Sequence, residues 1–232
     1  MSATASRLRN VPKPIAIVIG AGPGLGRSSA LRFARAGYDV GLVSRREETV
    51  KELAGEVTAA GADVGWAATD IADHDALEAA VRRMVEHTGR VDVLHFNPSA
   101  AREARARDLT APQLLADLAV GTAGVLTAVH AALPTLLEQR TGTVLVTGSG
   151  VADHPFPGFA SLGVQKAAVR NLTQALAADL GPEGIHVATV TVRGNLTPGT
   201  PTGPDAVADV LLALTEETAG DPAAWRTVVD LP

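Results

Sequence analysis

Three glycines near the start of the chain have the spacing of a loop that binds phosphate groups. Gly20, Gly24 and Gly26 stand at the first, fifth and seventh positions of the segment GAGPGLG. An apolar run, residues 14–19, precedes them, and a helical pattern, residues 28–36, follows. Glycine permits positive φ and lacks the Cβ that would block a close ligand. Because the start of a helix offers unpaired N–H groups and a positive dipole end, this stretch predicts a turn that binds a pyrophosphate.

A second candidate site follows the next apolar segment, at Ser44, Arg45 and Arg46. In a dinucleotide-binding fold, the end of the second strand faces the adenosine ribose, where an acidic side chain would bind the 2′-hydroxyl. Arginine instead accommodates a 2′-phosphate, because its planar guanidinium makes charge-assisted, bidentate hydrogen bonds. The pair favours NADP(H) over NAD(H); the alternative is an ordinary solvated arginine pair that opens a helix.

The composition excludes several classes of function. The chain has 232 residues, of which 46% are hydrophobic, and this suits one domain with a sizeable core. It has no cysteine for disulfides or thiolate zinc sites, and no two of its six histidines have the i, i+4 spacing typical of a metal site. The net charge of -5 argues against a nucleic-acid surface. We see no apolar run near the roughly 20 residues of a membrane span, and we expect a soluble, cytoplasmic protein without a signal segment or bound metal.

The elements that must position these residues alternate along the chain. Strands are expected at residues 14–20, 39–44, 63–69, 91–96, 143–147, 185–192 and 225–229, and helices at residues 24–36, 47–60, 73–87, 110–139, 159–180 and 205–217. The strands are continuously apolar, as in a parallel sheet that is covered on both faces. This alternation predicts a doubly wound α/β fold with ligands at the carboxyl ends of the strands. Residues 1–12 are expected to form a loose leader to a single domain of residues 13–232.

With these features the chain resembles the short-chain dehydrogenase/reductase family over residues 14–230. The glycine spacing matches that family's cofactor loop, and Asp70-Ile71 stands where the family places an aspartate near the adenine amine. Asn97 is the one residue kept from the family's Asn-Asn-Ala-Gly segment after the fourth strand. After the sixth strand, Val192-Arg193 replaces the usual Pro-Gly, and Thr197 holds the place of a threonine that contacts the nicotinamide amide. The resemblance implies a Rossmann-type domain with a parallel seven-stranded sheet in the order 3-2-1-4-5-6-7.

The resemblance also implies a catalytic tetrad of Asn, Ser, Tyr and Lys, of which this chain keeps two members. Ser149 takes the position of the serine that bonds the substrate oxygen, and Lys166 that of the lysine that holds the nicotinamide ribose. The position of the proton-transferring tyrosine, four residues before Lys166, is Leu162. The position of the asparagine, which supports a water relay, is Gly121.

No other tyrosine can replace the missing one. Tyr38, the only tyrosine, is expected at the amino edge of the sheet, whereas cofactor chemistry in this fold takes place at the carboxyl edge. His154 belongs to the loop that would line a substrate pocket, and histidine can exchange protons near neutral pH. Each of the three candidates has a structural alternative. His154 could be a solvent-exposed loop residue, Ser149 an ordinary turn serine and Lys166 a solvated lysine on a helix. His95, within a strand, is expected to be a satisfied core residue.

We therefore expect an NADP(H)-dependent oxidoreductase that acts on a small organic substrate with non-standard proton delivery. Because fold alone does not fix function, a redox-neutral isomerase or cyclase and a catalytically silent NADP-binding module remain alternatives. The two long helices, at residues 111–139 and 159–180, are apolar over more than one face and indicate a homodimer or homotetramer. The expected catalytic residues are Ser149, Lys166 and His154, and the expected cofactor-binding residues are Gly20, Gly24, Leu25, Gly26, Ser44, Arg45, Arg46, Asp70, Ile71, Asn97, Lys166 and Thr197.

Overall fold

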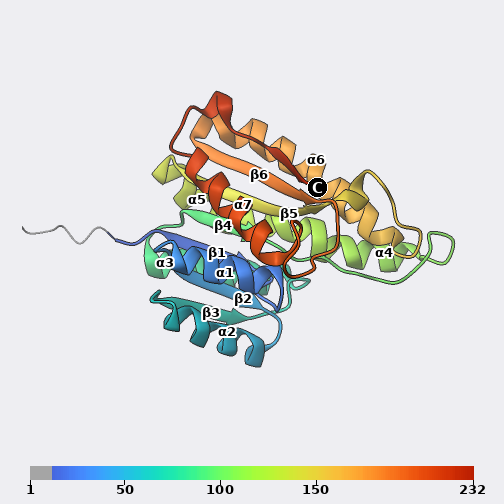
Figure 1. Cartoon of the computed structure of the whole chain (residues 1–232), viewed down its shortest axis with the longest axis horizontal. Coiled ribbons are helices and arrows are strands. Elements are labelled where there is room, and N and C mark those ends of the chain that lie inside the picture. Colours follow the sequence, from blue (N-terminus) through green and yellow to red (C-terminus); the bar gives the residue numbers. More distant parts are fainter. Residues whose placement is uncertain (1–11) are drawn as a thin grey trace, which may run out of the picture.

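The computed structural model describes residues 12–232, which form a single α/β domain around a seven-stranded sheet (Figure 1). The strands are β1 Ile15–Ile19, β2 Asp39–Ser44, β3 Val64–Ala68, β4 Val93–Phe96, β5 Gly142–Ser149, β6 Ile185–Val192 and β7 Val228–Leu231. Every neighbouring pair is parallel, in the order β3-β2-β1-β4-β5-β6-β7. This confirms the predicted fold class and strand order. Most of the expected leader, residues 1–11, lies outside the described residues.

Helices cover both faces of the sheet (Figure 1). They are α1 Leu25–Arg35, α2 Glu47–Ala59, α3 His74–Thr88, α4 Ala111–Leu118, α5 Gly124–Gln139, α6 Ala160–Leu180 and α7 Pro204–Glu217. Successive strand residues point to opposite faces, so Ala16 and Val18 of β1 join a core with α1, α2 and α7. Ile15, Ile17 and Ile19 of the same strand join a second core with α3, α5 and α6. The order of the strands reverses between β1 and β4, and this is where such folds bind their ligands.

Two strands differ from the predictions. The strand β3 is not covered on both faces, because it lies at the edge of the sheet; its Trp66 is 39% exposed and has the Lys51 ammonium 5.5 Å from the centre of its ring. The last strand begins at Val228 rather than at Trp225. The reason is that the Trp225 side chain is tied to the end of α7, where its Nε1 donates a hydrogen bond to the Glu217 carbonyl at 2.8 Å.

The long helix expected at residues 110–139 is interrupted. It begins with a capping box, in which the Gln113 side chain accepts a hydrogen bond from the Thr110 N–H and the Thr110 hydroxyl accepts one from the Gln113 N–H. A π-helical turn, Ala119–Ala123, then separates α4 from α5. Contrary to our expectation, residues 111–139 are long and apolar enough to cross a membrane by length and composition. In the fold, the inward face of α5 packs on the sheet through Val125, Ala128, Val129, Ala132 and Leu136.

Candidate functional site

The glycine loop joins β1 to α1 with a backbone that other residues could not adopt. Gly20 and Gly24 have φ of 80° and 90°, in the region that favours glycine. A Cβ at Gly26 would lie 2.2 Å from the Gly20 carbonyl oxygen, so only glycine lets α1 approach β1 this closely. A Cβ at Gly22 would meet nothing within 4 Å, because this part of the loop faces open space.

The start of α1 is available to an anion. No side chain caps the helix at Gly24, and its first turn contains no acidic residue. The positive end of the helix dipole and the first N–H groups are therefore not neutralised by the helix itself. Leu25, a predicted cofactor residue, is 2% exposed and belongs to the core, so that only its backbone can serve a ligand.

A hollow of about 840 Å³ opens in front of this loop, at the carboxyl ends of β1, β2 and β4. Its lining includes seven residues from the loop and from the ends of β2 and β3, namely Gly20, Gly22, Ser44, Arg45, Arg46, Asp70 and Ile71. Within residues 12–232, neither Arg45 nor Arg46 forms an ion pair, and both are exposed. The Asp70 carboxylate accepts a hydrogen bond from the Ala72 N–H at 3.0 Å. The structure thus brings the predicted adenosine-side residues together around one cavity.

Asn97 lies just after β4 and braces the glycine loop. Its Nδ2 donates to the Gly20 carbonyl at 3.2 Å, and its Oδ1 accepts from the Thr147 hydroxyl at 2.9 Å. Asn97 is not among the residues that line the hollow, so its present contacts are with the loop and with β5. In this position it fixes the loop relative to the strand that carries Ser149.

Lys166 is buried, which excludes the alternative that it is a solvated lysine on the surface of a helix. It is 5% exposed, and its Nζ donates to the Thr147 carbonyl at 2.6 Å. Burial disfavours the charged ammonium and lowers the pKa of Lys166 to about 8. Lys166 lines neither this hollow nor the one described below, and its Nζ lies against Thr147 near the end of β5.

His95 contacts the side chain of the same threonine, with its Nε2 3.1 Å from the Thr147 hydroxyl oxygen. Because that hydroxyl donates to Asn97, Nε2 of His95 must carry the proton and donate. Its Nδ1 has no partner among the described residues, so the expected satisfied histidine is satisfied at one nitrogen only. Burial, with the charge of Lys166, lowers the pKa of His95 to about 3. The ring is therefore neutral at physiological pH.

A second hollow, of about 810 Å³, lies at the ends of β5 and β6 and brings together three residues singled out in the sequence. Ser149 is the last residue of β5, His154 lies in the following loop, and Leu162 lies in the first turn of α6. Leu162 places an apolar side chain where the resemblance calls for a phenol. The remaining lining residues are Gly150, Val151, Phe156, Phe159, Val192, Arg193, Gly194 and Asn195.

Thr197 and the only tyrosine of the chain lie apart from both hollows. Thr197 is in an exposed loop and lines neither cavity. Tyr38 lies between α1 and β2, with its hydroxyl oxygen 3.4 Å from that of Thr215, at the amino edge of the sheet as expected. Sequence reasoning did not propose Arg193 as a site residue. Its guanidinium is 3.2 Å from the Asp153 carboxylate and 2.8 Å from the Asp230 carboxylate. The sequence signal that could have indicated Arg193 is the replacement of the family's Pro-Gly by Val192-Arg193.

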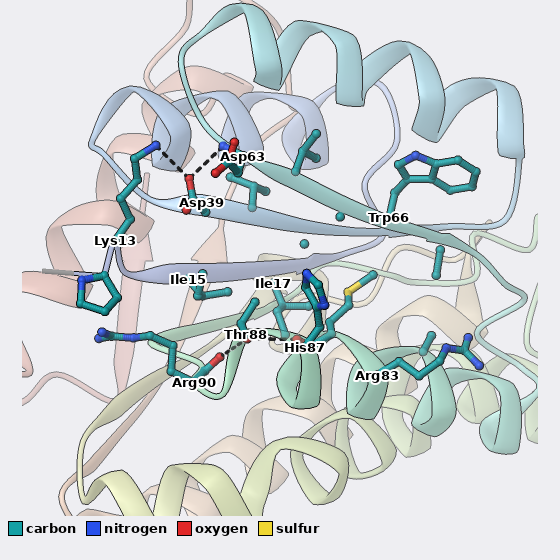
Figure 2. Close-up of a pocket in the computed structure, with 18 residues that line it drawn as sticks. Lys13, Ile15, Ile17, Asp39, Asp63, Trp66, Arg83, His87, Thr88 and Arg90 are labelled. Atoms are coloured by element: carbon teal, nitrogen blue, oxygen red, sulfur yellow. Dashed lines mark hydrogen bonds and ion pairs between the residues drawn. The ribbon is translucent and has the colours of Figure 1, made fainter. Parts of the chain in front are cut away.

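A further hollow, of about 540 Å³, lies between α3 and the strands β1 to β3, towards the other end of the sheet (Figure 2). At its rim, Lys13 binds the Asp39 carboxylate at 3.1 Å, and the Thr88 hydroxyl donates to the Arg90 carbonyl at 2.7 Å. It contains none of the predicted cofactor or catalytic residues. The candidate site therefore consists of the two hollows that contain predicted residues, the one at the glycine loop and the one at the ends of β5 and β6, which are together called the groove below.

Comparisons with known proteins agree with this geometry. The family model for the short chain dehydrogenases matches residues 14–202. Sulfoacetaldehyde reductase 2 of Chromohalobacter salexigens is 34% identical over 178 residues, which are 76% of this chain and 70% of that protein. The 3-oxoacyl-[acyl-carrier-protein] reductase FabG of Staphylococcus aureus is 31% identical over 173 residues, 74% of this chain and 70% of FabG.

Solved structures share the fold. Levodione reductase superimposes with a TM-score of 0.85 at 22% identity, covering 94% of this chain and 95% of its own. A metagenomic short-chain oxidoreductase in complex with NADP gives 0.83 at 22% identity, over 94% and 97% of the two chains. Carveol dehydrogenase from Mycobacterium avium in complex with NAD gives 0.82 at 21% identity, over 95% and 96%. Together with the glycine loop and the strand order, the family match shows that this chain belongs to the short-chain dehydrogenase family.

Proposed function

We propose that the protein is an NADP(H)-dependent oxidoreductase that obtains its proton from a group other than tyrosine. The observation that carries the proposal is the pair Arg45 and Arg46, which line the glycine-loop hollow and form no ion pair within the described chain. Two free guanidiniums beside an anion-binding helix start suit a nucleotide with an additional phosphate. The residues fit such a group, because the missing Cβ atoms at Gly22 and Gly24 leave the cradle open.

Each residue of the groove then has a defined task. The glycine loop and the start of α1 would hold the pyrophosphate, and Asp70 the adenine. A bound nicotinamide supplies or accepts the hydride. Ser149 would bind the substrate oxygen from the end of β5, and Lys166 would hold the ribose, as the family resemblance implies. Leu162 has no proton to give, which leaves His154 or water as the donor.

Titration calorimetry tests the cofactor preference. We expect the wild-type protein to bind NADPH at least about ten-fold more tightly than NADH, a difference of about 1.4 kcal/mol. Arg45→Asp should remove this preference, because an acid repels the 2′-phosphate and can bind the 2′-hydroxyl. Arg83→Asp, which makes the same charge change at an exposed position of α3, is the matched control. Equal affinities of the wild type for the two cofactors would refute the proposal.

Leu162 also favours a second candidate, a redox-neutral or catalytically silent NADP-binding protein, because the hollow lacks the phenol of the family. Consumption of NADPH, followed by absorbance with carbonyl, imine and enone compounds, separates the two. Turnover of any of these supports the oxidoreductase, whereas tight NADPH binding without consumption supports the second candidate.

We further propose a cytoplasmic homodimer or homotetramer that acts on a small molecule. The surface of α4, α5 and α6 exposes Leu115, Leu137 and Val164, which are 66%, 38% and 45% exposed. In the family that the chain resembles, the two long helices form such an interface. Light scattering at micromolar concentration should therefore give a multiple of the 23.7 kDa chain mass; a monomer mass would contradict this.

A further inference from the structure

The residue before Lys166 in the sequence is a completely buried glutamine that lines neither half of the groove. Gln165 of α6 has an exposed fraction of 0%. Its Oε1 accepts from the Ala100 N–H at 3.0 Å, and its Nε2 donates to the Ala100 carbonyl at 2.9 Å. One side chain thus pairs both polar backbone groups of a residue in the loop after β4. Such a buried amide is held by this pairing, because an unpaired one would be costly.

The carboxamide of Gln165 fills the space next to Gly121. A Cβ built on Gly121 would lie 2.1 Å from Oε1 and 2.9 Å from Cδ of Gln165. No side chain larger than hydrogen fits at position 121 while Gln165 is in place. Gly121 is the position at which the resemblance calls for an asparagine, and it lies within the π-helical turn Ala119–Ala123. A carboxamide is therefore present beside this turn, but it comes from the opposite helix.

The segment that Gln165 holds forms one wall of the cofactor hollow. Ala100 and its neighbours in sequence all line that hollow, namely Pro98, Ser99, Ala101 and Arg102. The ring of Pro98 is so close to the glycine loop that a Cβ at Gly20 would lie 3.0 Å from it. The Gln165 amide thus connects α6, which carries Lys166, to the wall of the hollow and through Pro98 to the glycine loop.

We propose that Gln165 and Gly121 form a compensating pair, in which Gln165 has taken over the place of the missing asparagine. Gln165 acts as a positioning residue: it holds the 97–102 segment at the distance from Lys166 that a bound cofactor requires. Its two contacts with Ala100 leave one N–H and part of the acceptor capacity of the amide for a water or ligand. The positioning role rests on the proposed function, because it presupposes a bound cofactor. The pairing of Gln165 with Gly121 does not depend on it.

A double-mutant cycle tests the pairing without any cofactor. Gly121→Asn alone should lower Tm by more than about 5 °C, because the new side chain overlaps Gln165. In the Gln165→Ala background, the same substitution should leave Tm unchanged or raise it, since the space is then free. Should Gln165→Ala fail to fold, Gln165→Ser also frees the space beside Gly121 while keeping a short polar side chain, and the cycle is run with that variant. An equal loss of Tm from Gly121→Asn in both backgrounds would overturn the inference.

Two further measurements test the positioning role. Gln165→Ala should raise the NADPH dissociation constant at least about ten-fold, and the exchange variant Gly121→Asn/Gln165→Ala should restore most of it. Gln165→Ala should also speed tryptic cleavage in the loop that contains Arg102, Arg105 and Arg107 by about five-fold, because the loop then loses one of its anchors and keeps the Arg102–Asp117 ion pair. Gln174→Ala, an exposed glutamine on the same helix, is the control and should behave as wild type in both.

The outcomes are separable. Wild-type affinity and wild-type cleavage in Gln165→Ala would overturn the positioning role. Failure of the wild-type protein to bind NADPH would refute the proposed function alone, because the Tm cycle and the cleavage rates still decide whether Gln165 anchors the loop and compensates for Gly121.

Discussion

The two halves of the groove have changed to different extents relative to the family pattern. The half at β1 and β2 keeps the spacing of Gly20, Gly24 and Gly26, and it adds an arginine pair that suits an additional phosphate. The half at β5 and β6 keeps Ser149 but has leucine in place of the tyrosine. The first half works through backbone shape, which the fold needs in any case. The second works through single side chains, which can be replaced while the fold stands.

Lys166 lines neither half of the groove but connects them through hydrogen bonds, which gives a physical reason for its presence. It donates to the Thr147 carbonyl, while the Thr147 hydroxyl donates to Asn97 and Asn97 in turn to the Gly20 carbonyl. This chain of contacts ties α6 to the glycine loop. A lysine that also supports the cofactor loop would persist whether or not the phenol beside it does, so its presence is evidence for cofactor binding rather than for the standard proton transfer.

The largest effect is expected from a test of the backbone half. Gly26→Ala places a Cβ 2.2 Å from the Gly20 carbonyl oxygen, and backbone on both sides leaves little room to relax. We expect a loss of about 3 kcal/mol in the free energy of unfolding, together with loss of NADPH binding. Gly22→Ala is the matched control, because its Cβ meets nothing within 4 Å. Urea unfolding that shows equal losses in the two variants would break the proposed contrast.

The next effect tests the side-chain half. Leu162→Tyr places a phenol in the hollow lined by Ser149, four residues before Lys166, whose pKa burial has lowered to about 8. A positioned general acid contributes 10²–10⁴-fold, and we expect reduction of simple ketones to rise by about 100-fold, the lower end of that range. Leu162→Phe adds the same ring without the hydroxyl and should not raise the rate. Steady-state kinetics in which the Phe and Tyr variants behave alike would show that the missing phenol is not what limits this half.

The fold could be predicted from the sequence because its evidence is repeated along the chain. The glycine turn and the alternation of apolar segments indicate one architecture, and the family resemblance implied the strand order that the structure shows. The errors fall where a tertiary contact decides. The sequence predicts a strand at Trp225, but its indole N–H donates a hydrogen bond to the Glu217 carbonyl at the end of α7. The apolar pattern of β3 does not indicate that this strand lies at the edge of the sheet.

The candidate site was only partly predictable, for a different reason. Local patterns predicted the glycines and the arginine pair, because each follows a strand or opens a helix, whereas Ser149 was implied by the family resemblance. The contact between Gln165 and Gly121 joins positions that are 44 residues apart, and no local pattern marks it. The same holds for His95, whose strand position predicted a core residue but not the lysine charge that acts on it.

The smallest effect concerns the joint between the two halves, where His95 meets Thr147. Its pKa of about 3 in the folded protein is below the ordinary value of 6.5. Between these values the unfolded chain binds a proton that the folded chain does not, so the free energy of unfolding must fall as pH falls from 6.5 towards 3. The limiting slope is about 1.4 kcal/mol per pH unit, which gives about 2 kcal/mol between pH 7.5 and 5.

His95→Leu should remove this share of the pH dependence, because leucine binds no proton in either state. His130→Leu, at an exposed position of α5, is the control and should retain it. Urea unfolding at pH 7.5, 6 and 5 measures the difference between the three proteins. If His95→Leu loses as much stability as the wild type over this range, the ring is accessible to protons in the folded state. The joint would then be open to solvent, and Lys166 would be expected to titrate near the ordinary value of 10.5 instead of about 8.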